Sequence, residues 1–173
     1  MSQQSDPEPL NIAEVQRRVA SELDRLGPVI DELGQMFADA GEQIALVGGP
    51  VRDAMLGRSH NDLDFTTSAR PEVTERLVTG WASAVWDIGR EFGTIGCRRK
   101  DARGDWQIEI TTYRSEEYDP DSRKPTVDFG DTLAGDLGRR DFTVNSMAIS
   151  LPGREFEDPY GGIVDLAHRV IRT

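Results

Sequence analysis

Residues 45–67, which read ALVGGPVRDAMLGRSHNDLDFTT, constrain this chain more than any other stretch. The apolar run at its start is closed by Gly48 and Gly49, and this pattern predicts a short buried strand that ends in a tight turn. Pro50 favours a helix directly after the turn, because its missing N–H is not needed in the first helical turn. Gly57 is placed to end that helix.

Two aspartates one residue apart, Asp62 and Asp64, follow the predicted short helix. In a strand they would share a face, roughly 6.6 Å apart along the chain, while Leu63 and Phe65 would face the core. Neighbouring carboxylates repel each other unless a cation lies between them. Mg²⁺ suits such a pair, because it takes carboxylate and phosphate oxygens together. The alternative for the aspartates is a solvated strand end.

The glycine turn, Gly48 and Gly49, precedes the predicted short helix. Backbone N–H groups at the N-terminus of a helix favour phosphate, and glycine leaves them accessible. The stretch therefore predicts a site for phosphate beside a site for Mg²⁺. A turn with a purely structural role is the alternative.

Composition limits the other possibilities. The 173 residues are enough for one domain, and the net charge of −11 argues against a chain that grips a nucleic acid backbone by itself. No apolar run is long enough to span a membrane, and the N-terminus does not have the layout of a secretory signal. Cys97 is the only cysteine, and the two histidines are too few for a histidine-based metal centre. We expect a cytoplasmic protein without membrane contact.

The remaining pattern predicts an α/β fold, with a small mixed sheet flanked by helices. Residues 1–9 are polar and contain proline, which predicts disorder, and 115–130 predicts a mobile loop. Gly27 and Pro28 predict a break between two helices. The other predicted helices are 12–26, 29–40, 68–80, 131–136 and 163–168, and the other predicted strands are 85–88, 93–99, 105–113, 147–151 and 170–172.

Three motifs together resemble the head domain of class II tRNA nucleotidyltransferases, which are the CCA-adding enzymes and the bacterial poly(A) polymerases. They are GGPVRDAMLG, DLDFTT and RRDFTVNSMAI, and the segment IEITTYR with the loop that contains RKP adds to the resemblance. The match covers residues 42–173, so the expected head domain is 10–173. The ordered set at these spacings is specific, whereas a double glycine or an Asp-x-Asp alone is not.

The resemblance implies roles for the residues of the first stretch. Asp62 and Asp64 match the paired aspartates that hold catalytic Mg²⁺. The turn Gly48-Gly49, with Arg52, matches the part that holds the triphosphate of the incoming nucleotide. For Arg52, a salt bridge to a neighbouring acid is the structural alternative.

The resemblance also implies roles for residues further along the chain. Arg140, Asp141 and Asn145 match the motif that contacts the ribose and phosphates of the nucleotide. Capping of the following helix is the alternative for Asp141 and Asn145. Glu109, on the strand face opposite the isoleucines, matches a carboxylate beside the active site, either as a metal ligand or as a hydrogen-bond organiser. Arg139 is predicted to be a surface charge.

The family pattern continues beyond the head with neck, body and tail helices, and the neck selects CTP or ATP. No such segment follows position 173, so we expect an isolated head in which base selection and most contacts with tRNA are missing. The expected function is Mg²⁺-dependent addition of CCA to the 3′ end of tRNA from CTP and ATP. The alternatives are a poly(A) polymerase, a nucleotide-binding fragment without transfer activity, and a structural interaction domain. The oligomeric state is not predicted.

The three tryptophans, Trp81, Trp86 and Trp106, are expected to serve packing rather than base stacking.

Overall fold

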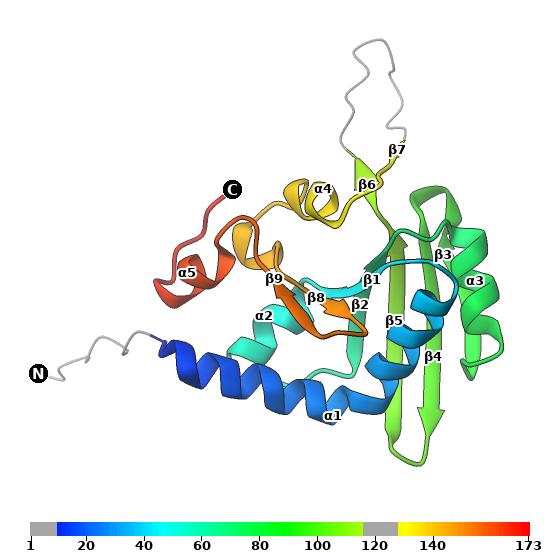
Figure 1. Ribbon diagram of the computed structural model, residues 1–173, viewed down its shortest axis with the longest axis horizontal. Coiled ribbons are helices and arrows are strands. Elements are labelled where there is room, and N and C mark those ends of the chain that lie inside the picture. The colour runs from blue at the N-terminus through cyan, green and yellow to red at the C-terminus, as the bar shows by residue number, and fades with distance from the viewer. Residues whose placement is uncertain (1–9, 116–127) are drawn as a thin grey trace, which may run out of the picture.

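The computed structural model describes residues 10–115 and 128–173. Seven described strands form one sheet in the order β3-β4-β5-β2-β1-β8-β9, while β6 and β7 form a separate ribbon (Figure 1). In the seven-stranded sheet, β2 and β5 run parallel and the other neighbouring strands run antiparallel. The predicted α/β class with a mixed sheet is confirmed.

The elements are α1 (Ile12–Asp39), β1 (Ile44–Val47), α2 (Gly49–Met55), β2 (Asp62–Thr67), α3 (Pro71–Thr79), β3 (Ala84–Gly89), the 3-10 helix η1 (Arg90–Phe92), β4 (Thr94–Asp101), β5 (Gly104–Thr112), β6 (Arg114–Ser115), β7 (Asp128–Phe129), α4 (Leu133–Gly138), the 3-10 helix η2 (Thr143–Asn145), β8 (Ala148–Leu151), β9 (Glu155–Glu157) and α5 (Gly162–Ala167).

One face of the sheet is apolar and forms the core with α1 and α3. Leu63 and Phe65 of β2 lie on this face, next to Ile108 and Ile110 of β5, and none of the four is more than 2% exposed. Helix α1 contacts β1 and β8, and α3 contacts β4. We call this apolar side of the sheet the inner face.

The predicted break at Gly27 and Pro28 is wrong, because α1 continues through both residues. A proline inside a helix removes a hydrogen bond and costs about 3 kcal/mol. Val29 and Ile30, which follow it, are fully buried against the inner face, and burial of each stabilises the fold by about 1.5–3 kcal/mol. Tertiary packing therefore offsets the local penalty.

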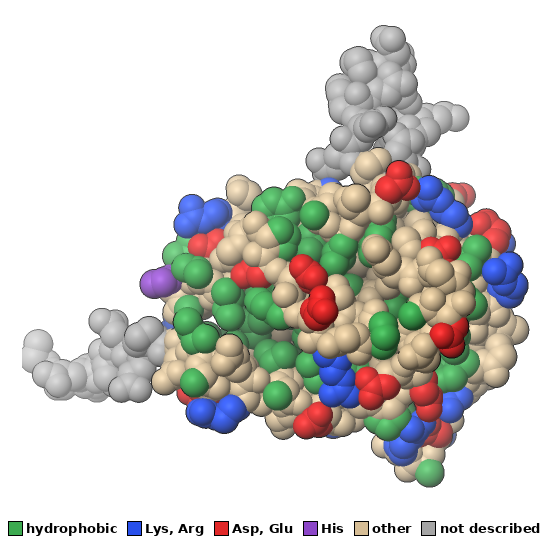
Figure 2. Space-filling view, viewed as in Figure 1, with side chains coloured by type: hydrophobic (Ala, Val, Ile, Leu, Met, Phe, Trp, Pro, Cys, Tyr) green, Lys and Arg blue, Asp and Glu red, His purple; other side chains and the backbone are tan. Residues whose placement is uncertain are grey.

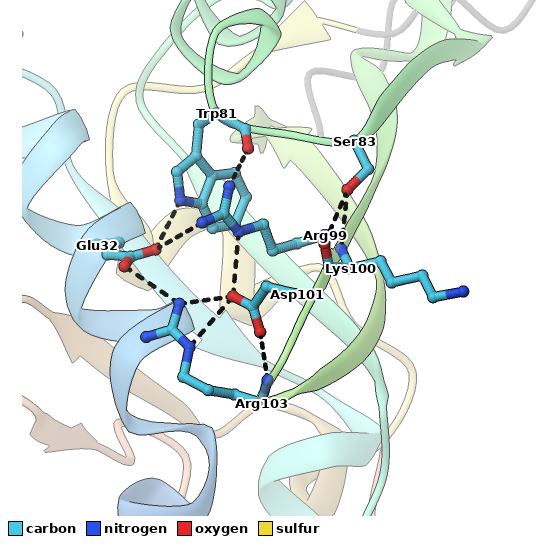
Figure 3. A network of polar contacts seen from close by, with 7 residues as sticks. All are labelled: Glu32, Trp81, Ser83, Arg99, Lys100, Asp101 and Arg103. Atoms are coloured by element: carbon cyan, nitrogen blue, oxygen red, sulfur yellow. Dashed lines mark hydrogen bonds and ion pairs between the residues drawn. The ribbon is translucent and has the colours of Figure 1, made fainter.

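A polar network fixes α1 against the hairpin of β4 and β5 (Figure 3). Glu32 of α1 accepts hydrogen bonds from Trp81 Nε1 at 2.7 Å and from Arg103 Nη2 at 3.4 Å. The guanidinium of Arg99 lies 5.0 Å from the centre of the Trp81 ring, and its Nε is 3.5 Å from Asp101 Oδ2. The network joins α1, the segment after α3 and the hairpin at one end of the inner face.

The opposite side of the sheet, which we call the outer face, is divided in two. Over β1 and β8 it is covered by α4, whose Leu137 packs with Val47 and Ala148 in a small apolar cluster. Over β2 and β5 it carries exposed polar side chains. These are Asp62, Asp64, Gln107 and Glu109.

The C-terminal part differs from prediction at two points. Strand β9 was not predicted; it extends the sheet as a hairpin with β8. The strand predicted at 170–172 is wrong, because this segment lies beside η2 and α5 rather than at a sheet edge. There the N–H of Thr143 donates to the carbonyl of Arg172 at 3.0 Å, and Arg172 Nε donates to Asp165 Oδ2 at 3.1 Å.

Two predicted segments fall largely or wholly on residues that the structure does not describe. The segment 1–9, predicted to be disordered, lies outside the described residues, and so do residues 116–127 of the loop predicted at 115–130. At the described ends of that prediction, Ser115 belongs to β6 and Asp128–Phe129 form β7, so these ends are strands rather than loop. Within residues 10–115 and 128–173, none of the helices combines the length and the apolar character needed to cross a membrane.

Candidate active site

Strands β2 and β5 bring three carboxylates together on the outer face. Asp62 and Asp64 are exposed while Leu63 and Phe65 are buried, so the predicted alternation along β2 is confirmed. Glu109 is the direct partner of Asp64 across the two parallel strands, and both side chains therefore leave the sheet on the same side. The predicted orientation of Glu109, opposite the isoleucines, is also confirmed.

The surroundings of Asp64 disfavour its ionised form. Partial burial raises the pKa of the Asp64 carboxyl, and the negative charges of Glu109 and Asp62 raise it further, while Arg140 acts in the opposite direction. A divalent cation beside these carboxylates would favour the ionised form of Asp64 and lower its pKa again.

The glycine turn lies directly under two arginines. Gly48 has φ +71°, a left-handed conformation that glycine adopts without strain, and it precedes α2. A Cβ atom on Gly48 would lie 3.5 Å from Arg140 Nη1, and one on Gly49 would lie 3.6 Å from Arg52 Nη2. The turn, Arg52 and Arg140 are therefore brought together, as the sequence predicted.

Arg52 is held from both sides. Its Nε donates to Asp53 Oδ1 at 2.9 Å, and its Nη1 donates to Asn145 Oδ1 at 2.8 Å. His60 Nε2 lies 2.6 Å from the other oxygen of Asp53. Burial alone would raise the pKa of Asp53, but the hydrogen bonds from Arg52 and His60 outweigh it and lower the pKa. The predicted salt bridge to a neighbouring acid exists, and it orients the guanidinium.

Asp141 does not cap η2, which has no side-chain cap, and Asn145 is the last residue of η2 rather than a residue before it. Asp141 Oδ1 accepts the N–H of the next residue, Phe142, at 2.9 Å. The side-chain oxygen of Asn145 is engaged with Arg52. Both residues line the same cleft as Arg52.

Asp136 organises the other arginines, and sequence reasoning did not single it out. Its carboxylate is fully buried and accepts from Thr66 Oγ1 at 3.0 Å and from the backbone N–H of Arg114 at 3.0 Å. It also accepts from Arg139 Nε at 3.3 Å and from Arg140 Nη2 at 3.4 Å. The spacing of three and four residues from Asp136 to the two arginines was the available signal.

These residues enclose a polar cleft of about 490 Å³, a volume suited to a small ligand. Seven of the nine predicted site residues line it, whereas Asp62 and Glu109 lie outside the lining. Arg114 was not predicted, and Arg139, predicted to be a surface charge, is only 22% exposed and faces the cleft. We call this the arginine cleft. Its polar lining is Gly48, Gly49, Arg52, Asp64, Thr111, Arg114, Arg139, Arg140, Asp141 and Asn145.

The charge of the arginine cleft favours an anion, although the whole chain is acidic. Burial lowers the pKa of Arg114, and the positive charges of Arg139 and Arg140 lower it further, which shows how closely the cations are grouped. Arg140 Nε is buried and has no hydrogen-bond partner among the described residues. A phosphate oxygen would satisfy this donor and relieve the repulsion.

The carboxylates beside the cleft suit Mg²⁺, which also takes water and substrate oxygens as ligands, better than a metal ion whose ligands all come from the protein. Among the described residues, no three acidic, histidine or cysteine side chains converge closely enough to hold a metal ion. Mg²⁺ is usually held by one or two carboxylates together with water and substrate phosphates. Asp62 and Asp64, beside the arginine cleft, could serve as such a pair.

A second cavity, of about 500 Å³, adjoins the arginine cleft and shares Arg52 and Asn145 with it. Figure 2 shows apolar side chains gathered around a hollow in this region, between the N-terminal end of α1 and α5. We call it the apolar groove. Its apolar lining is Leu10, Leu56, Phe142, Val144, Leu166, Val170 and Ile171.

Comparison with known proteins agrees with the resemblance drawn from the motifs. The family model of the Poly A polymerase head domain matches residues 44–172. The CCA-adding enzyme of Bacillus velezensis is 41% identical over 135 residues, which are 78% of this chain and 32% of that enzyme. The chain therefore spans about a third of the length of this relative.

Solved structures show the same partial correspondence. The CCA-adding enzyme of Bacillus stearothermophilus in complex with CTP aligns with a TM-score of 0.68 and 32% identity, over 86% of this chain and 33% of that one. A tRNA nucleotidyltransferase in complex with a primer tRNA and an incoming ATP analog aligns with a TM-score of 0.63 and 33% identity, over 81% of this chain and 38% of that one.

Proposed function

Because the chain belongs to the Poly A polymerase head-domain family, we propose that it is the catalytic head of an enzyme that adds CCA to the 3′ end of tRNA. The observation that carries the proposal is the position of Asp64. Its side chain lines the arginine cleft and lies near two further carboxylates, so the proposed phosphate site and the proposed cation site would meet at this side chain.

The arginine cleft would hold the triphosphate of CTP or ATP. Arg52 and Arg140 lie over the glycine turn, and arginine binds phosphate through two parallel N–H donors. Both guanidinium groups are fixed in advance by Asp53, Asn145 and Asp136, so little orientation is left to occur on binding. Asp141 and Asn145 line the same cleft and would contact the ribose and phosphates.

Asp62 and Asp64 would hold Mg²⁺, which supplies charge stabilisation and a lower pKa for the attacking hydroxyl when it is bound. The 3′ hydroxyl of the RNA then attacks the α-phosphorus of the nucleotide. A new P–O bond forms, the hydroxyl proton passes to water, the bond between the α-phosphorus and the oxygen that bridges to the β-phosphate breaks, and pyrophosphate leaves. Glu109 would act either as a further ligand of Mg²⁺ or as a hydrogen-bond organiser of the groups around Asp64. Its position beside Asp64 supports either role.

Poly(A) synthesis is the second candidate, and the name of the matching family favours it. The two activities use the same head residues and differ in which nucleotide is selected, a property assigned to the neck. The cytoplasmic location also stays a prediction.

The test is incubation of the chain with tRNA that lacks its 3′ terminal CCA, with labelled CTP or ATP, with and without Mg²⁺. We expect Mg²⁺-dependent incorporation of labelled nucleotide, without the order of CMP before AMP that base selection by the neck would impose. Long tracts from ATP alone would favour poly(A) synthesis, and nucleotide binding without any product would favour a non-catalytic fragment. A chain that binds neither nucleotide nor Mg²⁺ would overturn the proposal.

A further inference from the structure

A single row of residues crosses the outer face from the carboxylates to the edge strand β3. Asp64 pairs with Glu109, Glu109 pairs with Gly96 of β4, and Gly96 pairs with Trp86 of β3. Directly paired residues project from the same side of a sheet. Trp86 therefore stands on the same surface as the proposed catalytic residues, three strands away.

The indole of Trp86 covers Gly96 on the outer face. A Cβ atom on Gly96 would lie 2.6 Å from Cε2 of the indole, so the ring occupies the space that a side chain would fill. The ring thus extends along the row toward Glu109, and the residue remains 39% exposed. Trp106, on the inner face, is 3% exposed and packs as expected.

The position of the ring matches the path that an RNA primer must take. The leaving pyrophosphate lies on the side of the arginine cleft, and transfer of a phosphoryl group places the attacking and leaving oxygens roughly in line. The primer must then approach Asp64 from the other side, over β5, β4 and β3. The side toward β1 and β8 is closed by α4.

The spacing fits the last few nucleotides. Strands are about 4.8 Å apart, so the ring over Gly96 lies roughly 10 Å from the row position of Asp64. Stacked nucleotides advance about 3.4 Å each along a strand. A base within the last three nucleotides of the primer would reach the indole.

We propose that Trp86 is a stacking platform for a base near the 3′ end of the single-stranded RNA primer. The inference rests on the proposed function, since that function places the reacting hydroxyl at Asp62 and Asp64. Ile88, exposed at 46%, lies beside the ring, since a Cβ atom on Gly96 would also lie 2.8 Å from Ile88 Cδ1. The structural alternative is that the indole only shields Gly96.

The test measures binding of a labelled single-stranded RNA hexamer that ends in cytidine, by fluorescence anisotropy in the presence of Mg²⁺. Matched hexamers carry one abasic nucleotide at each of the last three positions in turn. Trp86→Leu should weaken binding of the intact hexamer about tenfold, a typical effect of one lost stacking contact. One abasic position should weaken binding to the unaltered chain similarly, and the two changes together should cost no more than either alone.

Phe156→Leu is the matched control, because Phe156 is an exposed aromatic residue on β9, at the opposite edge of the sheet. It should leave RNA binding unchanged. Trp86→Phe keeps an aromatic ring and should retain most of the affinity for the hexamer. If Trp86→Leu does not fold, the experiment with abasic hexamers is carried out on Trp86→Phe instead.

Equal affinity of the unaltered chain for intact and abasic hexamers would overturn the inference, and so would strictly additive losses in the combined experiment. Abasic-sensitive binding that depends on Trp86, in a chain that transfers no nucleotide, would instead support stacking and count against the proposed function. Failure of the stacking inference can therefore be distinguished from failure of the proposed function.

Discussion

The two faces of the sheet use neighbouring residues of the same strands for opposite purposes. On β2, Phe65 is 1% exposed in the core, while Asp64, one position earlier, stands among carboxylates on the outer face. The inner face gains stability from apolar burial. The outer face holds like charges together at a cost in stability, and the proposed binding of a cation and a phosphate would offset that cost. Stability and activity can therefore be changed separately along one strand.

Asp64→Asn should have the largest effect. Loss of a proposed metal ligand should lower nucleotide transfer by about a thousandfold or more, because electrostatic stabilisation of the reacting phosphate is the main contribution of such a site. The variant should keep its circular dichroism spectrum. Transfer within a few-fold of the unaltered chain would show that the outer face does not carry the chemistry.

Phe65→Ala, at the next position, tests the inner face. It removes a fully buried aromatic ring and should lower the free energy of unfolding by about 3–5 kcal/mol. Urea denaturation measures the change, and Leu63→Ala should behave in the same way. Destabilisation below about 1 kcal/mol in both variants would contradict the division into two faces.

Asp136→Asn should loosen the arginine cleft. Arg139 and Arg140 would lose the buried charge that holds them, so the KM for CTP should rise about tenfold, as for other residues that orient a binding group. Arg140→Lys should raise KM in the same direction.

Asp165→Asn is the matched control for Asp136→Asn. Asp165 is also buried and binds a threonine and an arginine, but it lies on the apolar groove. It should lower stability without changing the KM for CTP. An equal rise of KM in both variants would mean that the Asp136 effect is a general loss of packing.

Asp64→Asn should also stabilise the chain slightly in the absence of Mg²⁺. The pKa of Asp64 is raised on folding, so the folded state holds its proton at a pH where the unfolded state has released it, and ionisation costs stability as pH rises. The melting temperatures of the unaltered chain and of Asp64→Asn should therefore coincide well below pH 3.8 and separate increasingly toward neutral pH. A constant difference across this range would show that the raised pKa is not the cause.

Glu32→Gln should have the smallest effect. The side chain is 39% exposed, and partly exposed ion pairs contribute about 1 kcal/mol or less. Thermal unfolding should shift by only a few degrees, and nucleotide transfer should not change. A large loss of transfer would show that the network in Figure 3 supports the outer face as well as the inner one.

Patterns within a few residues were enough to predict much of the fold and of the site. The glycine turn, the alternation of Asp62 and Asp64 with Leu63 and Phe65, and the hairpin of β4 and β5 are all local features. The continuous α1 was missed because packing outweighed the penalty of Pro28, which a single sequence does not reveal.

Contacts between distant segments were the part that sequence reasoning missed. Asp136 reaches Thr66, 70 residues away, and it fixes the backbone of Arg114, 22 residues away. The charged residues were visible, but no local pattern indicated that one buried carboxylate would gather them. The packing predicted for Trp86 agrees with its position over Gly96, and the proposed stacking role could not be predicted because the register with Gly96 and Glu109 exists only in the assembled sheet.

The parallel pairing of β2 with β5 has a consequence for how the chain folds. Asp64 and Glu109 are neighbours in space, but α3, β3 and β4 lie between them in the sequence. Before β2 and β5 can pair, the long segment between them must bring its two ends together. Closing a long loop is slow. We therefore expect the carboxylate cluster to form late in folding, and a short peptide that contains only one of the two strands could not reproduce it.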